Sequence, residues 1–93
     1  MSLPEFIQMF CSELMKDQSI PSLQAINNGY CGWVADEILR YLNCAEEDET
    51  SYRQLENPKG YPGHFWVEYN GRHYDAEAPD GVEDWRELPI FKR

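Results

Sequence analysis

The sequence is short of basic residues, and it has no long apolar run. Eight Lys and Arg residues stand against seventeen Asp and Glu residues among 93, which gives a formal net charge of −9. Proteins that hold nucleic acid by its phosphates need the opposite balance, so we expect no nucleic-acid partner. No apolar run approaches the ~18 residues of a membrane-spanning helix, and no signal peptide is evident at the start. These absences favour an acidic cytoplasmic protein with no membrane partner.

Cysteine is also scarce. Cys11, Cys31 and Cys44 are odd in number and contain no C-x-x-C pair, whereas a disulfide framework needs an even count and a zinc ribbon needs such pairs. We therefore expect three reduced thiols. The chain has no repeats and is long enough for only one domain, residues 1–93. Its aromatic content of 14% exceeds that of disordered segments, so we expect a folded core.

Apolar residues at helical spacing are present in two places. They predict one helix over about residues 4–16 and a second from about Tyr30 or Cys31 to Leu42. Asn28 is the expected N-cap of the second helix. Residues 17–28 contain a proline, and Asn27-Asn28-Gly29 closes the segment, so we expect a connection there.

The clearest local signal is a β-hairpin. Two aromatic-rich runs flank an Asn-Gly pair, in the order His64-Phe65-Trp66-Val67-Glu68-Tyr69, Asn70-Gly71, Arg72-His73-Tyr74-Asp75-Ala76. Asn-Gly between such runs favours a type I′ turn, in which both turn residues have positive φ. The fold that we predict is therefore α+β, with two N-terminal helices packed on a small antiparallel sheet that contains the 64–76 hairpin. The tail, residues 79–93, is expected to pack across the core as a loop, a short helix or an edge strand.

The two-residue turn also fixes which hairpin residues share a face. One face carries an apolar set, Phe65, Val67, Tyr69, Tyr74 and Ala76. The other carries His64, Trp66, Glu68, His73, Asp75 and Glu77. On this second, polar face His64 and Asp75 are diagonal neighbours with Cβ atoms roughly 7–8 Å apart, which allows a hydrogen bond between imidazole and carboxylate. We expect the second helix to cover this face, and His73 to point to solvent.

Cys31 is the candidate nucleophile. It lies in the first turn of the second predicted helix, where the helix dipole and free N–H groups favour a thiolate. Gly29 and Gly32 flank it and leave room for a substrate chain. With His64 as base and Asp75 as the group that orients the imidazole, these residues form a catalytic triad of the cysteine type. The N–H of Cys31 and a neighbouring amide would form the oxyanion hole.

Three segments together resemble the transglutaminase-like branch of the papain-like cysteine enzymes. They are Asn28-Gly29-Tyr30-Cys31-Gly32-Trp33-Val34-Ala35, His64-Phe65-Trp66-Val67-Glu68-Tyr69 and Tyr74-Asp75-Ala76. In that family G-x-C opens a helix, H-x-W-V forms a strand, and an aspartate lies on the following strand. The resemblance implies a cysteine hydrolase or acyltransferase that acts on an amide of a protein or peptide, without a cofactor. Its nucleophile, base and orienting acid would be Cys31, His64 and Asp75.

Residues 64–93 also resemble small uncharacterised bacteriophage proteins, which would place the protein in the host cytoplasm. A non-enzymatic alternative follows from the charge, because an acidic phage-type domain can bind a basic protein surface. The carboxylates for such contacts lie in residues 46–49 and at Asp80, Glu83, Asp84 and Glu87.

A metal site is the other alternative for the candidate residues. Cys31, His64, Asp75 and Glu77 are chemically able to bind zinc, but no pair of them has a standard ligand spacing. The three tryptophans, Trp33, Trp66 and Trp85, are expected in the core and in the wall of a cleft. The sequence leaves the substrate and the oligomeric state open.

Overall fold

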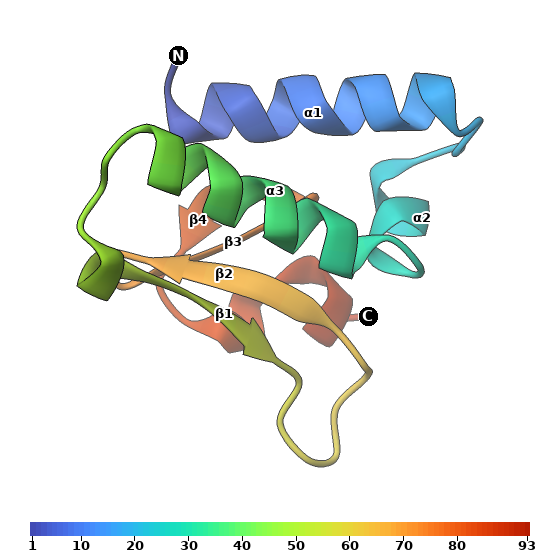
Figure 1. The fold of residues 1–93 in the computed structure, drawn as a ribbon. Helices are drawn as coiled ribbons and strands as arrows, with labels where there is room; N and C mark the ends of the chain where they lie inside the picture. The colour runs from blue at the N-terminus through green and yellow to red at the C-terminus, as the bar shows by residue number, and fades with distance from the viewer.

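The computed structural model describes all of residues 1–93 as an α+β fold, as the sequence predicts (Figure 1). The helices are α1 (Leu3–Asp17), α2 (Leu23–Asn27) and α3 (Cys31–Cys44). The strands are β1 (Tyr52–Glu56), β2 (Phe65–Tyr69), β3 (Arg72–Asp75) and β4 (Ala78–Val82). They form one antiparallel sheet in the order β1-β2-β3-β4. Three 3₁₀ turns are η1 (Glu49–Ser51), η2 (Trp85–Glu87) and η3 (Pro89–Phe91).

The helix boundaries follow from local capping. Ser2 and Glu5 form a reciprocal capping box at the start of α1, which satisfies two backbone N–H groups. The region expected to be a plain connection contains the short helix α2, whose N-cap Ser22 accepts from the backbone of Ala25. Asn28 is therefore not the N-cap of α3, as we expected, but the C-cap of α2. The N-cap of α3 is Tyr30, which provides no side-chain hydrogen bond.

The 64–76 hairpin has the predicted register. Asn70 and Gly71 have φ angles of 51° and 81°, as the type I′ turn requires. Val67 pairs with Tyr74 across β2 and β3, which places both on the apolar face. The hairpin lies in the middle of the sheet, because β1 pairs with β2 and β4 pairs with β3. Strand β1 was not predicted from the sequence. Strand β4 is an edge strand, which is one of the three structures that we expected for the tail.

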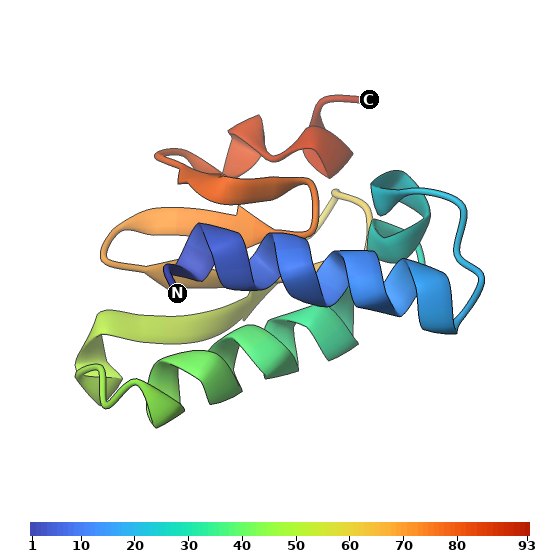
Figure 2. The same cartoon turned by 90° about the horizontal axis from the view of Figure 1, so that it is seen from above.

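The sheet is covered on both faces, by different parts of the chain. Helices α1 and α3 pack on the face that carries Val67 and Tyr74. The opposite face carries Trp66, which packs with residues of the C-terminal segment. Figures 1 and 2 show this arrangement, with the helices on one side of the sheet and the C-terminal turns on the other. The expectation that α3 covers the polar face is therefore wrong. The C-terminal aromatic residues bury that face, and the apolar stripe of α3 meets the apolar face instead.

Two further side chains depart from expectation. His73 does not point to solvent, since it is only 6% exposed and accepts a hydrogen bond from Nε1 of Trp66 at 3.0 Å. Its ring lies beside that of Trp66, with centroids 6.3 Å apart, and the residue pairs with Val82 of β4. Trp33 is not a core residue, because it is 45% exposed on α3 and contacts Phe10 and Tyr30 edge-on or tilted.

None of the three helices combines the length and apolar character needed to cross a membrane.

Candidate active site

His64 and Asp75 form the buried centre of the site. Nε2 of His64 lies 2.9 Å from Oδ2 of Asp75, and the two residues are 1% and 2% exposed. The hydrogen bond that the hairpin register predicts is therefore present. The His64 ring is stacked on Trp66 and meets Phe91 edge-on, with centroid separations of 5.9 and 5.8 Å. These aromatic contacts hold the imidazole in one orientation.

The hydrogen bond to Asp75 determines which nitrogen of His64 is available. A carboxylate only accepts hydrogen bonds, so Nε2 carries the hydrogen, and in the neutral ring Nδ1 keeps a free lone pair. Nδ1 is buried and has no hydrogen-bond partner. A free lone pair on a ring fixed by a carboxylate is the arrangement of a general base.

The carboxylate of Asp75 is held by three donors. Oδ2 accepts from His64 and from Nδ2 of Asn27, the latter at 3.3 Å, and Oδ1 accepts from the backbone N–H of Glu77 at 2.9 Å. Asn27 is the last residue of α2 and is 1% exposed. Its Nδ2 also donates to Oε1 of Glu77 at 2.9 Å, and the Arg93 guanidinium pairs with the same carboxylate. Asp75 is thus fixed from the sheet and from α2.

Cys31 is the first residue of α3 and is half-buried. The first hydrogen bond of this helix runs from the Val34 N–H to the Tyr30 carbonyl, so the three preceding N–H groups have no partner within the helix. Such a helix start carries partial positive charge, which stabilises an anion. The N–H groups of residues 31–33 are therefore the donors that could hold a negatively charged oxygen at this helix start.

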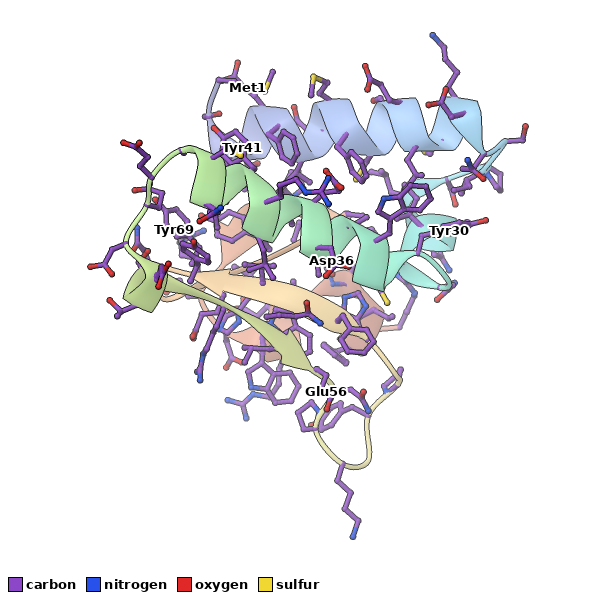
Figure 3. All side chains as sticks on the ribbon, viewed as in Figure 1. Met1, Tyr30, Asp36, Tyr41, Glu56 and Tyr69 are labelled. Atoms are coloured by element: carbon purple, nitrogen blue, oxygen red, sulfur yellow. The ribbon has the colours of Figure 1, made fainter.

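The start of α3 lies at the same end of the molecule as the start of β2. A Cβ placed on Gly32 would lie 3.8 Å from the ring of Phe65, the residue after His64. Figure 3 shows Tyr30 at this end of α3, and Figure 1 shows α2 beside it. The structure therefore brings His64 and Asp75 together, whereas Cys31 is hydrogen-bonded to neither of them, and Nδ1 of His64 has no partner.

The two glycines near Cys31 have room around their Cα atoms. A Cβ on Gly29 would meet no atom within 4 Å, and one on Gly32 would meet only the ring of Phe65, at 3.8 Å. No cleft or cavity of ligand size is present.

The other two cysteines differ from Cys31 in exposure. All three thiols are free, as expected. Cys11 is buried in the core between the helices, and burial, with a smaller contribution from the Asp75 carboxylate, raises its pKa to about 12. Cys44 is exposed at the end of α3. The chain therefore contains a buried and an exposed thiol with which Cys31 can be compared.

The residues of the metal alternative do not form a metal-binding group. No three His, Cys, Asp or Glu side chains lie close enough together to hold a metal ion, so Cys31, His64, Asp75 and Glu77 are not gathered around a common point. Glu77 instead contributes to the hydrogen bonds around Asn27.

Two features of the site lie outside the sequence-based expectation. Asn27 had only the signature of a turn, in an Asn-Asn-Gly segment, and no spacing rule links it to Asp75, which follows 48 residues later. Phe91 lies in an irregular tail without periodicity, so its contact with the His64 ring was equally hidden. Both contacts depend on tertiary packing.

Several carboxylates of the expected acidic contact surface have partners within the chain. Glu47 accepts a hydrogen bond from the Tyr69 hydroxyl. Asp84 accepts two side-chain bonds from Arg86, at 3.0 and 2.8 Å, which lowers the pKa of the carboxyl. These two groups stabilise local structure.

Comparisons with protein-family models, with curated proteins and with solved structures give no match for this chain.

Proposed function

We propose that the protein is a cysteine-dependent enzyme that transfers or hydrolyses the acyl group of an amide, as proteases, amidases, deamidases and transglutaminase-like enzymes do. The observation that carries the proposal is the state of His64, whose Nε2 is bound to Asp75 while its buried Nδ1 has no partner. A structural histidine would be expected to use both nitrogens or to leave one in water.

In this mechanism Cys31 is the nucleophile. The mechanism requires its sulfur to reach Nδ1 of His64 and to transfer the thiol proton to that nitrogen. The thiolate attacks the carbonyl carbon, and the negative charge on the carbonyl oxygen is held by the free N–H groups at the start of α3.

His64 then acts as an acid. It returns the proton to the leaving nitrogen, and a thioester on Cys31 remains. Water, or an amine as acyl acceptor, attacks the thioester with His64 again as base, and the thiol is regenerated. Asp75 keeps the hydrogen on Nε2 and stabilises the imidazolium in each step.

The substrate that we propose is a carboxamide on an extended segment of a peptide or protein. The surface at Gly29 is open, and there is no enclosed cavity to select a small molecule. The three free thiols suit a reducing compartment, so we place the activity in the cytoplasm. The basic-partner alternative is the weaker proposal, because Glu47 and Asp84 already have partners in the chain.

An activated ester tests the proposal without knowledge of the natural substrate. Mixing the protein with p-nitrophenyl acetate should release a burst of about one equivalent of p-nitrophenol as the acyl group forms a thioester. Mass spectrometry should locate the acetyl group on Cys31. Cys31→Ser should abolish the burst, whereas the matched control Cys44→Ser should keep it. Acetylation at Cys44 or at lysines alone, with no burst, would contradict the proposal.

A further inference from the structure

Asn27 is a buried polar residue whose hydrogen bonds are directed at the site rather than at its own helix. Its Nδ2 reaches Asp75 and Glu77, while its Oδ1 is buried without a partner. Burying an amide with an unsatisfied oxygen is costly, and an apolar side chain of similar size would avoid this cost. The presence of Asn27 is therefore not explained by packing.

The two bonds from Nδ2 separate two carboxylates. One hydrogen of the amide nitrogen serves Oδ2 of Asp75 at 3.3 Å, and the other serves Oε1 of Glu77 at 2.9 Å. Without a neutral donor between them, these negatively charged groups would repel each other in a region of low dielectric. Glu77 is in turn held by Arg93, with Nη1 2.9 Å from Oε1. Asn27 therefore connects the carboxylate that binds His64 to an anchored ion pair.

The same oxygen of Asp75 accepts from both Asn27 and His64. Its other oxygen is fixed only by the backbone N–H of Glu77. Rotation of the carboxylate about its axis is thus restrained at Oδ2 by Asn27 on one side and by the imidazole on the other. Loss of the Asn27 donor leaves the His64 bond as the only restraint on that oxygen.

We propose that Asn27 is a positioning residue of the site, which orients Asp75 and, through Asp75, the His64 ring. This inference rests on the proposed function, since orientation of His64 matters only if its Nδ1 takes a proton from Cys31. In the serine triad, disturbing the acid that orients the histidine reduces the rate by up to ~10⁴. Asp75 keeps two of its three donors when Asn27 is replaced, so we expect a smaller effect here, on the order of tenfold.

Two substitutions of Asn27 and one control test this role. Asn27→Asp has the same shape but replaces the donor by an oxygen that faces two carboxylates. Asn27→Leu removes the donor without adding charge, so it remains informative if the first variant does not fold. Asn28→Asp adds the same charge at the adjacent exposed position and is the matched control. Near-UV circular dichroism checks that each variant is folded.

The first readout is local to His64. In the wild-type protein the hydrogen on Nε2 should give a downfield NMR signal that is protected from solvent exchange, because the ring is buried and bound to Asp75. We expect this signal to broaden or exchange faster in both Asn27 variants and to stay unchanged in the control. A simple loss of packing at α2 would not change this one signal selectively.

The second readout is the rate at which iodoacetamide alkylates Cys31, with Cys44 in the same molecule as reference. Both Asn27 variants should slow Cys31 about tenfold and leave Cys44 unchanged. If His64→Ala slows Cys31 but neither Asn27 variant slows it or changes the NMR signal, the positioning role is overturned and the proposed function stands. If wild-type Cys31 reacts no faster than Cys44, both are overturned together.

Discussion

Acidification should weaken the fold through His73, the buried histidine that is not part of the candidate site. Nε1 of Trp66 donates to Nδ1 of His73 at 3.0 Å, a bond that requires a lone pair on that nitrogen. Burial lowers the pKa of the His73 imidazole below its usual 6.5, although the nearby carboxylates of Glu68 and Asp84 act in the opposite direction. Protonation at Nδ1 would set two donors against each other and remove the bond to Trp66.

The sign and size of the effect follow from this geometry. The pKa of His73 is lower in the folded state than in the unfolded chain, so the stability that neutral His73 contributes is fully present above about pH 6.5. It is lost as the pH falls from there through the folded-state pKa, with a slope of at most about 1.4 kcal/mol per pH unit for one proton. A buried indole N–H without an acceptor costs about 1–3 kcal/mol, so we expect a loss of that order between pH 8 and pH 5. A domain of this length has a total stability of only about 5–14 kcal/mol.

Urea denaturation followed by tryptophan fluorescence measures the loss directly. His73→Gln is the matched variant, because its amide oxygen also accepts a hydrogen bond but does not titrate. Since His64 is present in both proteins, the difference between their pH profiles isolates His73. The wild-type protein should lose stability relative to the variant below about pH 6.5. Parallel profiles, or a wild type that gains on the variant with acid, would refute the reasoning.

Three further predictions concern packing and the site. In urea titrations, Gly81→Ala should destabilise the fold by about 2–4 kcal/mol and Gly71→Ala by about 1 kcal/mol. Both glycines have positive φ, which an alanine adopts only with strain. Only at Gly81 would the added Cβ also clash, because it would lie 2.7 Å from the Tyr74 ring. Equal losses would contradict this packing. Cys11, whose pKa is raised to about 12, should remain unlabelled by iodoacetamide in native protein and react after unfolding, as peptide mass spectrometry can show. Asp75→Asn should slow the alkylation of Cys31 at least tenfold in a folded protein, since an amide favours the wrong tautomer of the histidine; an unchanged rate would remove Asp75 from the site.

The central hairpin could be predicted from the sequence because its determinants are local. The turn pair Asn70 and Gly71 sets the register, and the register places His64 diagonal to Asp75. Once the turn type is known, the period of two along a strand leaves little freedom, so the hydrogen bond between these two residues was predictable from spacing.

The covering of the sheet could not be predicted in the same way. Both faces of the hairpin carry large aromatic side chains, so hydropathy alone does not indicate which face meets the helices. The decision depends on Trp85 and Phe91, which are irregularly spaced and pack on Trp66 only in the folded chain. Strand β1 was hidden for a related reason, since Tyr52–Glu56 is mostly polar and is recruited by pairing with β2. Local signals therefore gave the hairpin, and tertiary packing decided what lies against it.

The pH dependence of Cys31 alkylation tests the central claim most directly. The rate of reaction with iodoacetamide should be measured for Cys31 and Cys44 in the same molecule from pH 5 to pH 9, in the wild-type protein and in folded His64→Ala. If His64 takes the thiol proton, wild-type Cys31 should react at least about tenfold faster than Cys44 near pH 6, and the substitution should abolish that advantage. Superimposable profiles for the two thiols, unchanged by the substitution, would contradict the account.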